Sequence, residues 1–310
     1  MAKILVCDRY EAEVLRILRA KGFEVDEKPQ ITTEELIACV GEYDAVMIRS
    51  RARVTREVLQ AGTKLKAVAR AGVGLDNVDV DYAKQRGIQV ISTPEASTTS
   101  VAELTIGLML GVLRQIGYAD RNLKEKKWVK PSITGRELKN KAVGIIGVGG
   151  RIGNEVARLL IVGFGCHVIG YDVTDFSQQA KKLGMGTAGT IEELLGKADI
   201  VTVHVPYLPS THHLINENRL RLMKKSAILV NAARGDVIDG RALLDALRKG
   251  QIAGAALDVY HDEPPKEEWE WELVSLPNTL CTCHIGAQTE ECQITGGRMV
   301  VEQLLKILKT

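Results

Sequence analysis

Short apolar runs alternate with amphipathic stretches through the first hundred residues. Glu11–Lys21 has apolar residues at helical spacing, and Thr32–Glu35 has the N-cap and early acids that begin a helix. The apolar runs predict strands at Ile4–Val6, Ala45–Ile48, Lys66–Ala69 and Gln89–Ile91. Further helices are predicted at Thr55–Gln60 and Asp79–Arg86. Strands that alternate with helices indicate a parallel sheet covered on both faces.

This pattern stops at the polar segment Ser92–Ser100, and a long apolar helix is predicted from Val101 to about Lys126. A second α/β series begins at Lys141. Its predicted strands are Val143–Gly147, His167–Tyr171, Ile200–His204, Ile228–Asn231, Ala255–Val259 and Thr279–Cys281. A final helix is predicted at Glu291–Leu308. The fold class is therefore α/β, with two doubly wound parallel-sheet domains and hinges near Pro94–Ser100 and His284–Thr289.

Composition agrees with an ordinary globular protein of about two domains. The chain has 310 residues, of which 45% are hydrophobic and 26% charged. A net charge of +2 and an aromatic content of 4% argue against nucleic-acid or membrane binding. The chain opens on a strand instead of a secretory signal, and the apolar stretch Val101–Leu113 is shorter than a membrane span. We expect a cytoplasmic protein whose six cysteines are reduced.

A glycine-rich turn follows the strand at Val143–Gly147 and opens a helix. Its glycines let the backbone approach a pyrophosphate, and the helix N-terminus offers N–H groups and a positive dipole. Asp172 ends the next strand, where it can bond to ribose hydroxyls and would repel a 2′-phosphate, which favours NAD over NADP. The alternative is a polar residue that merely ends a strand. One extra glycine makes the spacing irregular, so the contacts can be shifted by one residue.

Three more polar side chains follow predicted strands or a nearby turn. Arg234 can bind a carboxylate through two parallel hydrogen bonds, although a surface ion pair is an alternative. His284, if placed against Glu263, can exchange a proton with a hydroxyl or carbonyl oxygen, although each could also lie on a solvated surface. A metal site at Cys281, Cys283 and His284 is disfavoured, because no second Cys/His pair completes a tetrahedral set.

The order of these motifs resembles the D-isomer-specific 2-hydroxyacid dehydrogenases over nearly the whole chain. The matching segments are the glycine-rich turn, Asp172, Asn231–Gly235, Asp258–Pro264 and Cys283–Ala287. The resemblance implies a Rossmann-type NAD domain at residues 98–285, inserted into a discontinuous flavodoxin-like substrate domain at 1–97 and 286–310. It also implies a homodimer that uses the long helix after Val101. Because the sequence ends at Thr310, we expect a short form without a serine-binding regulatory domain.

The resemblance also implies roles for individual residues. Arg234, Glu263 and His284 match the catalytic residues, and Asp258 matches the acid that contacts the nicotinamide carboxamide. The cofactor site would contain Gly147, Gly149, Gly150, Arg151, Ile152, Asp172, His204, Val205, Pro206, Thr211, Ala232, Ala233, Arg234, Asp258, His284, Gly286 and Ala287. The substrate site would contain Arg49, Ser50, Arg51, Arg70, Gly72, Val73 and Gly74.

The substrate-domain segments Ile48–Thr55 and Ala69–Asp79 are similar to those of the subgroup that oxidises D-3-phosphoglycerate. Arg49, Arg51 and Arg70 come from neighbouring strand ends and can meet a phosphate, whereas Arg53 is expected to face solvent. We therefore expect a phosphorylated 2-hydroxyacid as the substrate. Two alternatives stay open: a glyoxylate or hydroxypyruvate reductase of the same family, and an NAD-sensing binding protein without turnover.

Overall fold

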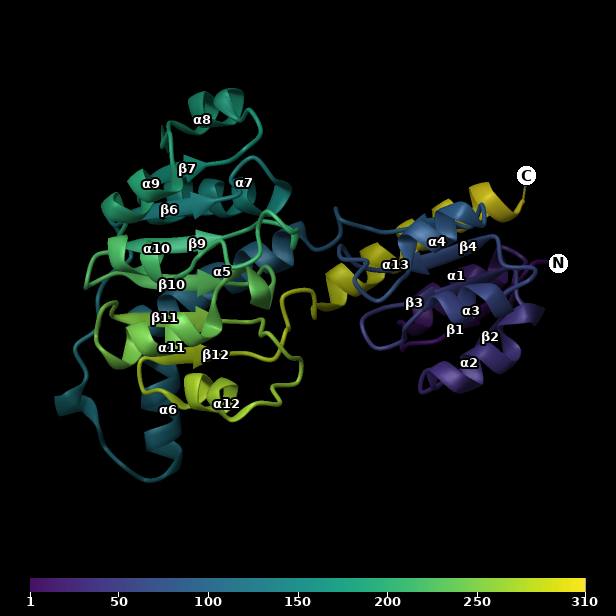
Figure 1. Cartoon of the computed structure of the whole chain (residues 1–310), viewed down its shortest axis with the longest axis horizontal. Coiled ribbons are helices and arrows are strands. Elements are labelled where there is room, and N and C mark those ends of the chain that lie inside the picture. The colour runs from purple at the N-terminus through teal and green to yellow at the C-terminus, as the bar shows by residue number, and fades with distance from the viewer. Residues whose placement is uncertain (310) are drawn as a thin grey trace. The chain divides into compact units, whose positions relative to one another are not determined.

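A parallel five-stranded sheet organises the first of two compact units in the computed structural model, which describes residues 1–309 (Figure 1). Unit 1 comprises Met1–Ser97 and the C-terminal segment from Ala287 on. Its sheet has the order β2-β1-β3-β4-β5, which is the flavodoxin-like order. The strands are β1 Lys3–Val6, β2 Glu24–Glu27, β3 Ala45–Ile48, β4 Ala67–Arg70 and β5 Gln89–Ile91. The helices are α1 Ala12–Ala20, α2 Thr33–Cys39, η1 Val40–Glu42, α3 Arg56–Ala61, α4 Val80–Gln85 and α13 Glu290–Leu308.

The two faces of this sheet carry separate apolar clusters, as a strand period of two requires. Leu5 packs on the face covered by α2, α3 and α4. Its neighbours Ile4 and Val6 pack on the other face, with α1 and α13. At roughly 2 kcal/mol for each fully buried leucine, this burial on both faces is what holds unit 1 together. Thr32 caps α2 by accepting a hydrogen bond from the Glu35 N–H, which confirms the predicted helix start.

Unit 2 is Thr98–Gly286 and contains a seven-stranded parallel sheet of order β12-β11-β10-β9-β6-β7-β8, which is Rossmann-type. The strands are β6 Ala142–Ile146, β7 His167–Tyr171, β8 Gly186–Thr187, β9 Ile200–Val203, β10 Ile228–Asn231, β11 Gly254–Leu257 and β12 Thr279–Cys281. The α-helices are α5 Thr98–Leu113, α6 Ile116–Lys124, α7 Arg151–Arg158, α8 Ser177–Leu183, α9 Ile191–Lys197, α10 Glu217–Leu222, α11 Gly240–Arg248 and α12 Glu268–Ser275. Shorter helical turns are η2 Lys130–Ser132, η3 Leu159–Gly163 and η4 Gly235–Val237. Both sheets are parallel and covered by helices, which confirms the predicted fold class.

The strand order of unit 2 reverses beside β6, because β7 pairs with one of its edges and β9 with the other. In open α/β sheets, ligands bind outside the carboxyl ends of the strands at such a switch point. The turns that follow β6, β7, β9 and β10 all lie at this end of the sheet. They carry most of the residues that the sequence predicts for the cofactor site.

The prediction of one continuous helix from Val101 to about Lys126 is wrong. The segment forms two helices, α5 and α6, which are bent by 68°. Gln115, between them, has the left-handed backbone angle φ 52°, and the Leu113 carbonyl accepts a hydrogen bond from the Arg136 N–H. The second helix buries none of its residues, whereas α5 packs deeply in the core.

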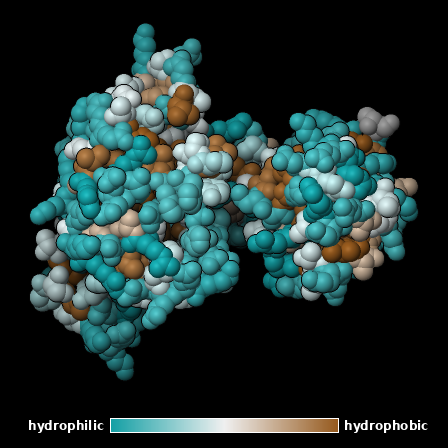
Figure 2. All heavy atoms as spheres, in the orientation of Figure 1, coloured by the Kyte–Doolittle hydropathy of each residue, from teal (hydrophilic) through white to brown (hydrophobic). Residues whose placement is uncertain are grey.

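Among residues 1–309, no single helix has both the length and the apolar character needed to cross a membrane. The bent pair α5 and α6 meets that requirement only when the two are taken together. The face seen in Figure 2 is mostly hydrophilic, with apolar residues interspersed.

Candidate active site

The glycine-rich loop Gly147–Gly153 joins β6 to α7. Gly147 has φ 89°, and a Cβ there would lie 2.5 Å from the His204 carbonyl oxygen, so the tight turn requires glycine. Gly153 brings α7 against the turn, because a Cβ there would lie 2.3 Å from the Gly147 carbonyl oxygen. Gly150 is the N-cap of α7, and Arg151 and Ile152 are its first residues. The extra glycine therefore lengthens the interval between Gly149 and Gly153, and the first two glycines keep their spacing.

Asp172 follows β7 and faces this loop. Its Oδ2 accepts a hydrogen bond from the Gly149 N–H at 2.8 Å, and its Oδ1 accepts from both the N–H and the hydroxyl of Thr174. A side chain on Gly149 would press against this carboxylate, with its Cβ 3.0 Å from Oδ2. A backbone cradle, a helix N-terminus and an adjacent carboxylate together fit the pyrophosphate and ribose of a dinucleotide.

The segment after β9 contains the predicted adenosine-side residues. The Thr211 hydroxyl donates to the Pro206 carbonyl at 2.7 Å and accepts from the Leu208 N–H, which closes the loop after Val205. His204 is half-buried, with its Nε2 3.0 Å from the Thr202 hydroxyl. Burial lowers the pKa of His204 to about 4, so its imidazole is neutral at pH 7.

The turn after β10 carries Ala232, Ala233 and Arg234. Asn231, which is 1% exposed, shapes it from inside: its Nδ2 donates to the Arg234 carbonyl at 2.9 Å and its Oδ1 accepts from the Ala233 N–H. The Arg234 guanidinium donates to the Ala233 carbonyl at 2.7 Å. Arg234 is thus presented at the carboxyl end of the sheet by a buried amide.

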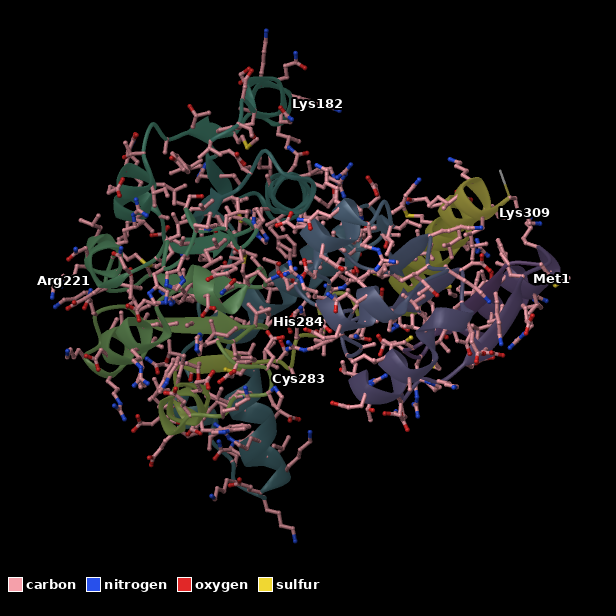
Figure 3. The ribbon with its side chains drawn as sticks, turned by 45° about the vertical axis from the view of Figure 1, so that its right-hand side comes forward. Met1, Lys182, Arg221, Cys283, His284 and Lys309 are labelled. Carbon is pink, nitrogen blue, oxygen red and sulfur yellow. The ribbon has the colours of Figure 1, made fainter. Side chains whose placement is uncertain are left out.

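The fold brings His284 and Glu263 into direct contact, although 21 positions separate them in the sequence. The imidazole Nδ1 of His284, labelled in Figure 3, lies 2.5 Å from Glu263 Oε2. The other carboxylate oxygen accepts from the Tyr260 N–H at 3.2 Å. The His284 and Glu263 side chains are 44% and 36% exposed, so the pair is accessible from solvent. With Nδ1 held by the carboxylate, Nε2 is the ring atom available for proton exchange.

Asp258 organises the loop that carries this histidine. It is 1% exposed, and its carboxylate accepts hydrogen bonds from the Thr282 hydroxyl and the Ile285 and Gly286 N–H groups at 2.6, 2.8 and 2.9 Å. His284 itself adopts the left-handed φ of 53°. The family resemblance implies a nicotinamide contact for Asp258, and the structure adds that its carboxylate holds the loop of His284. Ala287, the next predicted cofactor residue, is the first residue of the C-terminal part of unit 1.

The predicted substrate residues of unit 1 differ from one another in their hydrogen-bond and ion-pair partners. Arg51 directs its guanidinium inward, to Asp8 at 3.2 Å and to the Cys7 and Ile31 carbonyls. The contacts with Asp8 and the two carbonyls give Arg51 a structural role inside unit 1. Arg70 instead donates to Asn77 Oδ1 at 2.8 Å.

Asn77 connects the two remaining arginine segments, because its Nδ2 donates to the Arg49 carbonyl at 3.0 Å and its Oδ1 accepts from Arg70. Within residues 1–309, no hydrogen bond or ion pair engages the Arg49 side chain, and Ser50 beside it is exposed. The N–H of Gly72 donates to Thr93 Oγ1, while Val73 is 43% exposed and Gly74 follows it in the same turn. Asn77 is not among the predicted site residues, although it lies inside the segment Ala69–Asp79 that carries the family resemblance.

In the described part of the chain, no group of three or more His, Cys, Asp and Glu side chains could hold a metal ion. The cysteines at 281 and 283 are free thiols. The polar groups that the structure places along the carboxyl edge of the unit 2 sheet include the His284–Glu263 pair, Arg234 and the glycine-rich loop.

Comparisons with known proteins agree with this geometry. The family model "D-isomer specific 2-hydroxyacid dehydrogenase, NAD binding domain" matches residues 106–286. A D-3-phosphoglycerate dehydrogenase of Methanocaldococcus jannaschii is 44% identical over the full chain, which spans only 58% of that relative's length. A hydroxypyruvate reductase of Thermotoga maritima is 40% identical over 99% of this chain and 98% of its own.

A crystal structure of a Thermus thermophilus protein superimposes with a TM-score of 0.90 at 34% identity, over 99% of this chain and 97% of that one. These matches confirm the family resemblance and the expected NAD cofactor. The chain belongs to the D-isomer-specific 2-hydroxyacid dehydrogenases, and residues 106–286 match their NAD-binding domain.

Proposed function

We propose that this protein catalyses the NAD-dependent oxidation of D-3-phosphoglycerate to 3-phosphohydroxypyruvate, which would place it in serine biosynthesis. The observation that carries the proposed reaction is the 2.5 Å contact between His284 Nδ1 and Glu263 Oε2. A carboxylate in that position fixes the tautomer of the imidazole and stabilises its protonated form.

The chain's own residues account for proton movement and orientation. The hydroxyl proton of the substrate passes to His284 Nε2, and Glu263 stabilises the resulting imidazolium. Arg234 binds the substrate carboxylate and polarises the forming carbonyl. The cofactor would be held by Gly147–Ile152 and Asp172, and when bound it supplies the nicotinamide carbon that accepts the hydride.

Recognition of the phosphate is assigned to Arg49 and Arg70. Two guanidinium groups suit a phosphate dianion because their N–H groups match its oxygens in pairs. Asn77 hydrogen-bonds both to the Arg70 guanidinium and to the Arg49 carbonyl, which supports a shared role for the two arginines. We leave Arg51 out of this set, since its guanidinium lies 3.2 Å from Asp8 and also donates to the Cys7 and Ile31 carbonyls, whereas Arg70 lies 4.0 Å from Asp76.

A glyoxylate or hydroxypyruvate reductase is the second candidate. The Thermotoga maritima relative, named hydroxypyruvate reductase, matches along nearly its whole length, and this observation favours that candidate. The same three catalytic side chains would serve, without a phosphate site.

We further propose a homodimer in the cytoplasm. Three large apolar side chains in and just after α6 are exposed: Ile116 by 54%, Leu123 by 61% and Trp128 by 75%. Apolar groups this exposed on one projecting segment are typical of an interface. Sedimentation velocity on the purified protein, with a Trp128→Glu variant as comparison, tests the assembly.

The test of function follows NADH consumption with 3-phosphohydroxypyruvate, hydroxypyruvate and glyoxylate side by side. We expect kcat/KM for the phosphorylated acid to be at least ~100-fold higher, or about 2.7 kcal/mol. Comparable values for the unphosphorylated acids would favour the reductase. NADH binding without turnover on any of them would point to an NAD-sensing protein.

A further inference from the structure

We propose that His261 is a positioning residue, which acts through Asp236 to hold the turn of Arg234 against the segment of Glu263. This proposal rests on the proposed function, because it concerns the same catalytic groups. The sequence placed His261 only within a family motif and gave it no role.

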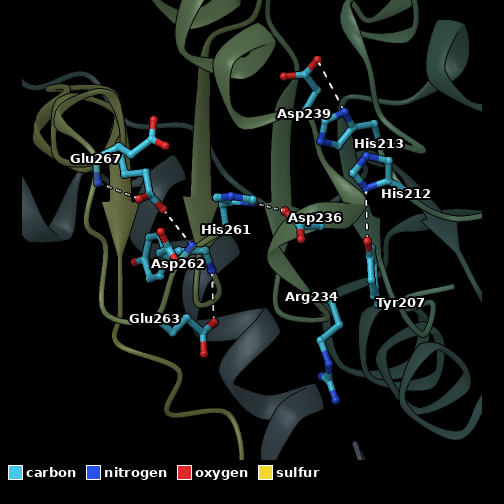
Figure 4. A network of polar contacts seen from close by, with 12 residues as sticks. Tyr207, His212, His213, Arg234, Asp236, Asp239, His261, Asp262, Glu263 and Glu267 are labelled. Atoms are coloured by element: carbon cyan, nitrogen blue, oxygen red, sulfur yellow. Dashed lines mark hydrogen bonds and ion pairs between the residues drawn. The ribbon is translucent and has the colours of Figure 1, made fainter. Parts of the chain in front are cut away.

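The contact joins two segments that are distant in sequence. His261 Nδ1 lies 2.5 Å from Asp236 Oδ1, and the two residues are 25 positions apart. Asp236 belongs to η4, directly after Arg234, and His261 lies two residues before Glu263. In Figure 4 the His261–Asp236 contact bridges the two segments, and Arg234 and Glu263 point to the same side of the bridge.

The backbones under this bridge are already in contact. A Cβ on Gly235 would lie 1.9 Å from the Tyr260 carbonyl oxygen, so the turn and the segment touch with no space for a side chain. Tyr260 in turn donates its N–H to Glu263. A shift of the His261 segment would therefore be passed directly to the carboxylate that holds His284.

The far side of the same segment is fixed by a buried acid. Glu270 is 2% exposed, and its carboxylate accepts hydrogen bonds from the N–H groups of Asp262, Lys266 and Glu267 at 2.9, 3.0 and 3.1 Å. With Glu270 on one side and Asp236 on the other, the position of Glu263 is set from both directions. His261 is the member of this arrangement that can gain or lose a proton near neutral pH.

The charges around His261 favour its protonated form. The hydrogen bond to Asp236 is the main cause that raises its pKa, with smaller contributions from Asp262 and Glu270. Its ring lies 6.3 Å from that of Trp269, over which the Arg241 guanidinium sits. Arg241 is itself paired with Glu267, which limits its repulsion of the imidazolium.

The experiment compares kcat in the oxidation direction for His261→Ala, Asp236→Ala and the double variant. We expect each single variant to lose about 10-fold in kcat, because small displacements of catalytic groups are costly, with KM for NAD unchanged. The double variant should lose no more than either single one, because both remove one shared contact. Losses that multiply to about 100-fold would overturn the proposal.

A conservative variant separates positioning from a general structural role. His261→Asn keeps an N–H donor near the Nδ1 position, so it should restore most of the kcat that His261→Ala loses. The imidazole can donate Nδ1–H to Asp236 whether it is charged or neutral, so the wild type and His261→Asn should have the same pH profile of kcat. His167→Asn, at an exposed histidine at the start of β7, is the matched control and should leave kcat unchanged. A His261→Asn variant whose kcat stays as low as that of His261→Ala would contradict the proposal.

One readout does not depend on turnover. The NMR chemical shifts of the His284 ring protons at a fixed pH should change in His261→Ala and return in His261→Asn, because the Glu263 carboxylate moves and is then restored. A wild-type protein that oxidises none of the hydroxyacids would refute the proposed function, while these chemical shifts would still decide the positioning role. Unchanged His284 chemical shifts in His261→Ala would refute that role.

Discussion

The carbonyl oxygen of Asp258 accepts a hydrogen bond from the main-chain N–H of His284 at 2.8 Å. The carboxylate of the same aspartate binds the two following N–H groups, at Ile285 and Gly286. One buried acid thus sets the path of the backbone on which the histidine is carried. The side-chain contact with Glu263 then orients the ring, so the backbone and side chain of His284 are fixed by different residues.

Removal of the proton acceptor should abolish most of the turnover. We expect His284→Ala to lower kcat by ~10² to 10⁴, and Glu263→Gln to lower it less, because the amide can still accept a hydrogen bond from Nδ1. NADH binding, followed by fluorescence titration, should be retained in both variants. Near-normal kcat in His284→Ala would remove this residue from the mechanism.

The proposed phosphate site predicts a selective change in KM. Arg49→Ala combined with Arg70→Ala should raise KM for 3-phosphohydroxypyruvate at least ~30-fold more than KM for glyoxylate, which is about 2 kcal/mol of phosphate binding. Arg53→Ala is the matched control, since Arg53 is an exposed arginine on the same segment. Equal effects on the two substrates would argue against phosphate recognition by this pair.

The fold follows from the sequence where apolar patterning is strong. The apolar runs Ile4–Val6 in β1, Ala45–Ile48 in β3 and Ile228–Val230 in β10 predict their strands, because all of these side chains pack in a core. The edge strand β2 was missed, since its sequence Glu24–Glu27 is mainly acidic and only partly buried. The helix break at Gln115 was missed for a different reason, because helical patterning continues on both sides of a single left-handed residue.

The sequence predicts those site residues that lie in recognisable motifs, and it does not predict the contacts between them. Arg234, Glu263 and His284 could be named from the sequence, but the His284–Glu263 contact spans 21 residues and exists only in the fold. Asn77 and the His261–Asp236 pair act through contacts between separate segments. No local pattern marks such residues, because an Asn in a turn or a His near an acid is common on any surface.

Two glycine-to-alanine changes, one in the glycine-rich loop and one in α9, should have opposite effects on the free energy of unfolding. Gly153→Ala places a Cβ 2.3 Å from the Gly147 carbonyl oxygen, so we expect a loss of about 1–3 kcal/mol in the free energy of unfolding and weaker NADH binding. Gly196→Ala, in α9, has nothing within 4 Å of the added Cβ and should stabilise the protein by about 0.5–1 kcal/mol. Urea unfolding and NADH titration of both variants measure this. Normal NADH affinity in Gly153→Ala would contradict the close approach of α7 to the cofactor loop.

Asp172 should govern the choice between NAD and NADP. Asp172→Ser removes the charge that repels a 2′-phosphate and the strongest acceptor for the ribose hydroxyls. We expect kcat/KM with NAD to fall by about 10- to 100-fold, in line with the loss of hydrogen bonds to a charged group, and the preference over NADP to shrink by a similar factor. Initial rates with each cofactor test this. A preference that survives the substitution would place cofactor discrimination elsewhere in the loop.

The neutral histidine beside the glycine-rich loop predicts a dependence of stability on pH. Burial holds the pKa of His204 at about 4 in the folded protein, against an ordinary value of 6.5. Between these values the unfolded chain binds a proton that the folded chain does not, so stability rises with pH and falls as the solution is acidified through this range. Allowing for partial exposure, we expect about 1–3 kcal/mol from this group between pH 7 and pH 4. His204→Gln cannot take up the proton, so its urea midpoint should fall less than that of the wild type over the same interval. Identical losses in both proteins would mean that other groups, such as the paired carboxylates, account for the acid sensitivity.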